Sequence, residues 1–95
     1  MIVIAGHLLV DEADRAACVD AHRDLVRRAR AFDGCLELSI SADSVDSRRV
    51  NNLEVWEDAG ALDSWRSQAD APDHAIEPLG GSMQRYDATD GGPLF

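Results

Sequence analysis

The sequence has few positive charges and no apolar run long enough to cross a membrane. Nine basic residues stand against 18 acidic ones, giving a net charge of −9 and a pI of about 4.5. An acidic surface repels phosphate backbones, so nucleic acid is not expected as a partner. The start of the chain, MIVIAGHLLVDEAD, has neither the basic flank nor the small-residue cleavage site of a signal peptide. We therefore expect a cytoplasmic protein with no membrane partner.

Residue patterns that hold metals or nucleotide cofactors are also missing from the sequence. The two cysteines, Cys18 and Cys35, are in neither CxxC nor CxxH spacing, so no zinc site is predicted and both are interpreted as buried free thiols. The sequence has no glycine-rich dinucleotide loop and no Ser-His-Asp set in a supporting context. We therefore predict no metal and no cofactor.

Hydrophobic periodicity over the 95 residues predicts one domain with the element order β-α-β-β-α-β. The predicted ranges are strands at 2–10, 35–41, 49–57 and 82–88, and helices at 13–32 and 59–69. A polar loop is expected at 42–48, and the segment 70–81 either is irregular or holds one short helical turn around 73–77. This order is typical of the ferredoxin-like α+β fold, in which an antiparallel four-stranded sheet carries both helices on one face.

Three residues are expected to set the helix ends. Asp11 and Asp58 each precede a predicted helix, and an aspartate there accepts hydrogen bonds from the free backbone N–H groups of the first turn. Gly34 follows the first helix, where glycine readily adopts the left-handed conformation that ends a helix.

The predicted sheet has more apolar surface than two helices can cover. The first strand is apolar on both sides, and an uncovered apolar face is a typical association surface. A two-fold homodimer is the commonest arrangement of identical subunits. We therefore predict a homodimer that covers this face, and light scattering that shows a monomer at micromolar concentration would contradict it.

Several segments resemble the antibiotic biosynthesis monooxygenase family, in the family's own order. MIVIAGHLLV is similar to its first strand, AFDGCLELSIS to its helix-to-strand transition, and NLEVWEDAGALDSW to its third strand and following helix. APDHAIEPL resembles the SPHFxAF segment, and MQRYDA the closing strand. The resemblance covers residues 1–88 and leaves 89–95 as a tail. It implies a dimeric α+β barrel with a pocket between sheet and helices in each subunit.

The resemblance draws attention to one face of the third strand, in NNLEVWED. Alternation places Asn52, Glu54 and Trp56 on one face, and Leu53 and Val55 on the other, which is interpreted as the core stripe. Trp56 matches a tryptophan of the oxygenase branches, and Asn52 matches an asparagine of the quinone-forming branch. An amide and an indole N–H are suited to stabilise a substrate anion in a dry cavity; the alternative is a core tryptophan beside a hydrogen-bonded asparagine. Glu54 lies between them and is a candidate general base if burial raises its pKa; the alternative, which we favour, is a structural pairing with an arginine across the dimer.

Three histidines and a second tryptophan complete the candidate site. His7, in the first strand, is the candidate base for a phenolic proton, because histidine titrates near neutral pH; the alternative is a core or interface histidine. His22, on the flank of the first helix, either faces the pocket or lies at its rim. His74 falls in the segment where the haem-degrading branch carries its iron ligand. Trp65 either packs in the core or forms a wall of the pocket.

These residues leave three functions open. The first is a cofactor-independent monooxygenase that oxidises a flat aromatic or phenolic, polyketide-like substrate with O₂ to a quinone-type product. The second is haem binding or degradation, although the haem branch carries an asparagine where this sequence has His7. The third is a non-catalytic dimeric module for a small hydrophobic ligand. It is favoured by the lack of the Tyr and Arg that the quinone-forming branch uses near its second helix.

Overall fold

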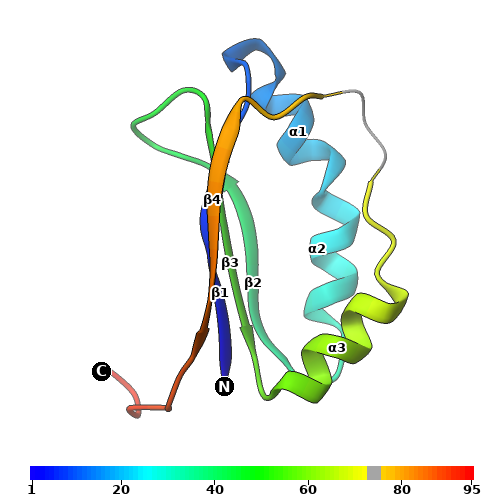
Figure 1. The fold of residues 1–95 in the computed structure, drawn as a ribbon, viewed down its shortest axis with the longest axis vertical. Coiled ribbons are helices and arrows are strands. Elements are labelled where there is room, and N and C mark those ends of the chain that lie inside the picture. The colour runs from blue at the N-terminus through cyan, green and yellow to red at the C-terminus, as the bar shows by residue number, and fades with distance from the viewer. Residues whose placement is uncertain (73–75) are drawn as a thin grey trace.

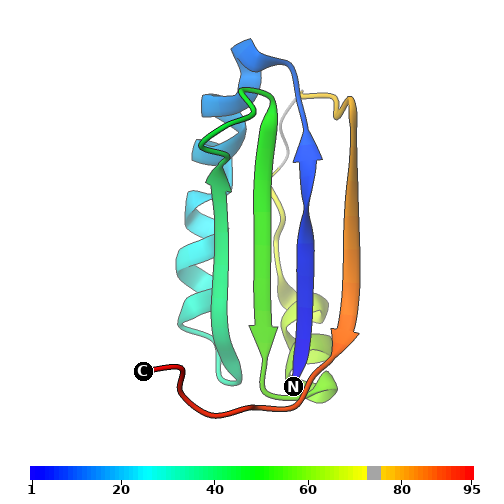
Figure 2. The ribbon, with the colours of Figure 1, turned by 90° about the vertical axis from the view of Figure 1, so that its left-hand side faces the viewer.

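The computed structural model describes residues 1–72 and 76–95, which fold into two layers (Figure 1). One layer is an antiparallel four-stranded sheet with the strand order β2-β3-β1-β4, seen face-on in Figure 2. The helices form the other layer, on a single face of the sheet. The strands are β1 (Ile2–Leu9), β2 (Cys35–Ala42), β3 (Arg49–Trp56) and β4 (Gly80–Asp87). The helices are the short 3₁₀ helix η1 (Glu12–Asp14), α1 (Arg15–Ala21), α2 (Arg23–Arg30) and α3 (Ala59–Gln68). The predicted ferredoxin-like α+β class is confirmed.

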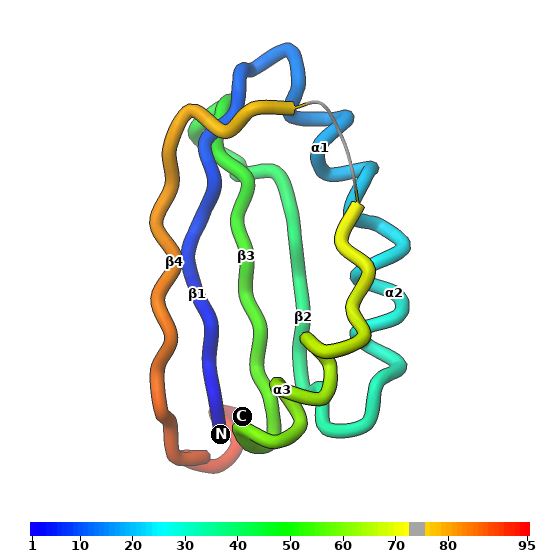
Figure 3. Tube along the Cα trace, turned by 45° about the vertical axis from the view of Figure 1, so that its right-hand side comes forward, coloured from blue at the N-terminus to red at the C-terminus, as the bar shows by residue number. Residues whose placement is uncertain are grey.

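The segment after α3 returns beside α2 before the chain enters β4 (Figure 3). Arg28 Nη2 donates to the Asp70 carbonyl oxygen at 2.9 Å, which ties the start of this segment to α2. The short helical turn considered around 73–77 falls largely on residues 73–75, outside the described residues. The last strand begins two residues earlier than predicted, at Gly80, since the Gly pair still forms a backbone ladder with β1.

The predicted single helix at 13–32 is wrong, because the helix is divided at His22. The backbone N–H of His22 donates to the Val19 carbonyl at 3.2 Å, one residue short of the regular α-helical acceptor. That acceptor, the Cys18 carbonyl, is instead 2.8 Å from Nδ1 of the His22 side chain. A side chain that bonds to a nearby backbone acceptor competes with the helical ladder. The break is therefore set by His22 itself.

The helix ends at Gly34 and Asp58 are as predicted. Gly34 has φ of 92°, a conformation that favours glycine, and a Cβ there would lie only 2.5 Å from the Ala61 Cβ. Asp58 Oδ1 accepts a hydrogen bond from the Ala61 backbone N–H at 2.8 Å. Asp11 also caps a helix, but the short η1, through the Ala13 N–H at 2.9 Å.

The main core lies between the sheet and the helices α2 and α3. Its buried members come from five elements and are Ile2, Ile4, Ala29, Leu38, Trp56, Leu62 and Trp65. Phe32 packs edge-on against both tryptophans, with ring centroids 6.4 Å from Trp56 and 5.5 Å from Trp65. A smaller cluster of Val10, Cys18 and Val50 is formed where α1 packs on the sheet.

The core lies on the opposite side of β3 from the one predicted. Trp56 is fully buried under the helices, and strand alternation puts Asn52 and Glu54 on the same side. Leu53, 40% exposed, and Val55 therefore lie on the face that the described helices leave uncovered (Figure 1). Their interpretation as the core stripe is wrong for a single subunit. The exposed apolar surface on that face is what the predicted homodimer would bury, and the dimer stays a prediction.

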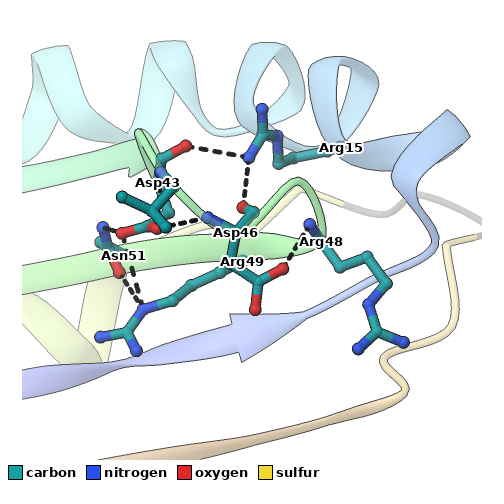
Figure 4. A network of polar contacts seen from close by, with 7 residues as sticks. Arg15, Asp43, Asp46, Arg48, Arg49 and Asn51 are labelled. Atoms are coloured by element: carbon teal, nitrogen blue, oxygen red, sulfur yellow. Dashed lines mark hydrogen bonds and ion pairs between the residues drawn. The ribbon is translucent and has the colours of Figure 1, made fainter.

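The loop between β2 and β3 is held by a polar network that also anchors α1 (Figure 4). Arg15 Nη1 donates to the carbonyl oxygens of Asp43 and Asp46, at 3.1 and 2.7 Å. The Asp43 carboxylate accepts from the backbone N–H groups of Val45 and Asp46 and from Asn51 Nδ2, at 2.8–3.0 Å. The N–H of Asp46, followed by those of Asn51 and Val45, holds the pKa of Asp43 at about 2.

Replacing Asp43 by asparagine is expected to make the melting temperature less dependent on pH in the acid range. A carboxyl group with a lowered folded-state pKa stabilises the fold above its ordinary value of 3.8, and that contribution is lost as the pH falls through about 2. Melting temperatures measured by circular dichroism should therefore fall more steeply between about pH 4 and pH 2 for the wild type than for Asp43→Asn. Asp63→Asn, on the exposed side of α3, should behave as the wild type. Parallel profiles for Asp43→Asn and the wild type would contradict the assignment.

Candidate ligand cavity

A partly enclosed cavity of about 210 Å³ lies between α1 and the sheet. Its lining residues are Leu8, Cys18, His22, Ile40, Val50, Asn52 and Met83. Strand register accounts for the floor, since Met83, Gly6, Asn52 and Ile40 form one row across the four strands. Cys18 contributes from the middle of α1 and His22 from its C-cap position. The lining is therefore mainly apolar, with His22 and Asn52 as its strongly polar side chains.

Gly6 allows the outer strand to approach the floor of this cavity closely. A Cβ at Gly6 would lie 2.0 Å from the Ser82 carbonyl oxygen and 2.8 Å from the Met83 Cα. Any side chain there would push β4 away, as is common where glycine interrupts a strand. Met83 instead lies over Gly6, and a Cβ at Gly6 would be 2.9 Å from its Sδ. The flexible Met83 thioether thus closes the β4 side of the cavity.

The hydrogen bond to Cys18 determines which ring nitrogen of His22 carries a proton. A carbonyl oxygen only accepts hydrogen bonds, so Nδ1, at 2.8 Å from it, must be the donor. In the neutral ring Nε2 is then the basic nitrogen. Burial raises the pKa of the neighbouring Cys18 thiol, so the thiol stays neutral at pH 7. His22 therefore lines this cavity with its Nδ1 proton held by a backbone carbonyl.

Asn52, Glu54 and Trp56 are joined to one another by hydrogen bonds. The two oxygens of the Glu54 carboxylate accept separately, Oε2 from Asn52 Nδ2 and Oε1 from Trp56 Nε1, both at 3.1 Å. The donors that the sequence assigned to a substrate anion are thus engaged with a carboxylate. The interpretation of Glu54 as a structural partner agrees with these contacts, but its partners are Asn52 and Trp56.

The two tryptophans are core residues in this structure and do not line the cavity. Trp56 is fully buried and Trp65 is 5% exposed. Their rings stack with a centroid distance of 6.0 Å and an interplanar angle of 25°, while the Arg28 guanidinium lies over Trp65 at 5.8 Å. The expectation that Trp56 contacts a substrate oxygen, and that Trp65 forms a pocket wall, is therefore corrected in favour of the core alternative.

His7 lies on the wrong face of the sheet to act with Asn52. It pairs with Asn51 and Ser82, whereas Asn52 pairs with Gly6, and paired residues share a face. Its placement beside Asn52 and Trp56 is therefore wrong within one subunit. It borders a separate surface hollow of about 420 Å³ beside Leu79 and Gly80. His74, the candidate from the segment that resembles SPHFxAF, lies outside the described residues.

Sequence reasoning missed most of the cavity's apolar lining. In the sequence, nothing distinguishes Leu8, Ile40 and Val50 from other apolar strand residues. Met83 lies in the last strand, and no sequence pattern marks it as a cavity residue either. One signal was available: an isolated glycine inside an apolar strand indicates a close approach by another segment. Gly6 marks the cavity floor in this way. Within the described residues, no group of three or more His, Cys, Asp or Glu side chains is arranged to hold a metal ion.

The fold and the cavity together define an α+β protein with a small, mainly apolar ligand site under its first helix. The antibiotic biosynthesis monooxygenase family model matches residues 1–75, and the chain belongs to this family. None of the helices in the described part of the chain is long and apolar enough to cross a membrane. No curated protein matches the chain by sequence.

Solved structures share the fold at low sequence identity. A protein of Deinococcus radiodurans has a TM-score of 0.74 at 17% identity, covering 100% of this chain and 99% of that one. A protein of Pseudomonas aeruginosa has a TM-score of 0.70 at 20% identity, covering 94% of both chains. A structure described as an antibiotic biosynthesis monooxygenase has a TM-score of 0.68 at 19% identity, covering 95% of this chain and 100% of the other. At these identities the likeness establishes the fold alone.

Proposed function

We propose that this protein oxidises a small phenol with O₂ to a quinone, in the cavity between α1 and the sheet. The observation that carries the proposal is that His22 and Asn52 line the same, otherwise apolar cavity. The Nδ1 proton of His22 is held by the Cys18 carbonyl. Membership of the antibiotic biosynthesis monooxygenase family supports the reaction type. A second subunit, proposed to cover the open face of the sheet, completes the functional unit.

The residues favour a proton transfer that prepares the substrate for O₂. His22 Nε2 takes the phenolic proton, and the resulting imidazolium lies beside the phenolate and offsets its charge. An electron-rich phenolate passes an electron to O₂ far more readily than the neutral phenol does. One oxygen atom then becomes the carbonyl oxygen at the para carbon and the other leaves as water. The substrate loses its phenolic hydrogen and one ring hydrogen, so no separate reductant is required.

Cavity size narrows the substrate class. An apolar cavity of about 150 Å³ is enough to hold benzene, whereas drug-sized ligands occupy pockets of about 300–1,000 Å³. The 210 Å³ cavity lies between these limits. It therefore favours a phenol of one or two fused rings over the polycyclic, polyketide-like substrate expected from the family resemblance. The same size offers no support for a haem macrocycle, and a purely ligand-binding module would lack oxygen uptake in the test below.

Oxygen uptake with 1-naphthol tests the proposal. One O₂ is expected to be consumed per 1,4-naphthoquinone formed, and with isotopically labelled O₂ one label should enter the quinone carbonyl. Buffer without protein measures spontaneous oxidation. A protein-dependent rate no higher than this background, with 1-naphthol, with a one-ring phenol and with the corresponding diols, would contradict the proposed function. Binding of either phenol without turnover would leave the non-catalytic module as the better description.

A further inference from the structure

Glu54 controls which atom of Asn52 faces the cavity. A carboxylate can only accept hydrogen bonds, so the amide group 3.1 Å from Oε2 must be the Asn52 NH₂ and not its oxygen. The other carboxylate oxygen is held by the Trp56 indole N–H at 3.1 Å. Because Trp56 is fully buried among core aromatic rings, this second bond fixes the position of the carboxylate.

The amide oxygen of Asn52 is consequently directed away from Glu54. Along β3, Glu54 lies on one side of Asn52 and Val50 on the other, and all three side chains share one face. Val50 and its β1 partner Leu8 line the cavity. Oδ1 therefore faces the cavity, and the described part of the chain contains no fully buried side-chain oxygen or nitrogen without a partner. The cavity thus presents a hydrogen-bond acceptor at Asn52.

We propose that Glu54 is a positioning residue that makes the cavity selective for an aromatic substrate with a second, protonated hydroxyl group. The inference rests on the proposed function in taking this cavity as the substrate site. The hydroxyl deprotonated by His22 becomes an anion, which an amide oxygen repels. A second hydroxyl on the ring keeps its proton and donates to Asn52 Oδ1. The substrate class is therefore a small aromatic diol, and an ether oxygen at the second position is rejected because it has no proton to donate.

Two ligands of matched shape test this selectivity by binding alone. 1,5-Dihydroxynaphthalene carries the second hydroxyl, whereas 5-methoxy-1-naphthol carries an oxygen that only accepts. Dissociation constants are measured without O₂, by tryptophan fluorescence and by calorimetry, so that turnover does not interfere. The wild type is expected to bind the diol about tenfold or more tightly than the methyl ether.

Glu54→Gln separates the positioning role from a merely structural one. Glutamine can donate as well as accept, so the Asn52 amide is free to turn its NH₂ toward the cavity and to bind the ether oxygen. The ratio of the two dissociation constants is expected to fall at least threefold toward unity. Glu37→Gln, which removes an exposed carboxylate from β2, should leave the ratio unchanged. Steric effects of the methyl group are common to all three proteins and cancel in the comparison.

The outcomes distinguish this inference from the proposed function. If Glu54→Gln weakens both ligands equally, or if the wild type does not discriminate between them, the positioning role is overturned even when turnover is observed. Discrimination that depends on Glu54 without any oxygen uptake would overturn the proposed reaction and support the inference. Failure of the wild type to bind either ligand would overturn both.

Discussion

Replacing His22 by glutamine is expected to lower protein-dependent oxygen uptake with 1-naphthol by about 10²- to 10⁴-fold, the usual contribution of a general base. Glutamine can still donate to the Cys18 carbonyl, which His22 Nδ1 contacts at 2.8 Å, so the turn between α1 and α2 is retained. It cannot take a proton. The loss should therefore appear in the turnover number, while the binding of 1-naphthol without O₂ changes by only a few-fold.

His7→Gln provides the matched control for this prediction. His7 is also a histidine on the sheet, but it lies on the opposite face from Asn52, and its replacement should leave oxygen uptake within about threefold of the wild type if proton transfer takes place in the cavity. His22→Ala supplies a second measurement, because added imidazole should restore part of its activity. Equal losses in the His7 and His22 variants, or full activity in His22→Gln, would contradict the role assigned to His22.

Trp56→Ala is expected to lower the free energy of unfolding by about 3–5 kcal/mol, as is usual when a large buried aromatic side chain is removed. The indole is fully buried, stacks on Trp65 and donates to Glu54. A small domain has a total free energy of unfolding of only about 5–15 kcal/mol. Each kcal/mol that is lost lowers the melting temperature of a domain of this size by about 4–8 °C. The melting temperature should therefore fall by roughly 12–40 °C, measured by circular dichroism at one fixed protein concentration.

Two further variants decide whether Trp56 is a core residue or a catalytic one. Trp56→Phe keeps an aromatic ring in the core and should retain oxygen uptake within a few-fold, because Trp56 does not line the cavity. Phe95→Ala removes an exposed aromatic side chain from the C-terminal tail and should change stability by no more than about 0.5 kcal/mol. If Trp56→Phe folded normally but lost oxygen uptake, the indole would have to contact the substrate after all.

Local features of the fold could be predicted because the signals for them lie within a few residues of one another. Asp58 caps α3, and Gly34 ends the first helical region in a left-handed conformation, as their residue types require. The alternation of β3 correctly placed Asn52, Glu54 and Trp56 on one face. The break at His22 was missed because it depends on a single side chain competing for the Cys18 carbonyl, against a helical periodicity that continues through it.

The candidate site was predicted less well, since its members were chosen by residue type and not by position in space. Asn52 and His22 do line one cavity. His7 was assigned to it from β1, but the register that pairs His7 with Asn51, and Gly6 with Asn52, puts it on the other face. A shift of one residue in register reverses every such assignment, and hydrophobic patterning cannot fix the register of a strand that is apolar on both sides.

The sequence by itself determined the element order, the ferredoxin-like class and the strand face that carries Asn52, because periodicity and helix-end residues act over short distances. Only the tertiary structure decided which residues of that face are buried in the core and which line the cavity. Packing of α2 and α3 buries Trp56 in the core, the hydrogen bonds of Glu54 turn the Asn52 amide, and the break after α1 brings His22 to the same cavity. These outcomes depend on how the layers pack, because packing brings residues distant in the chain, such as His22 and Asn52, to one cavity.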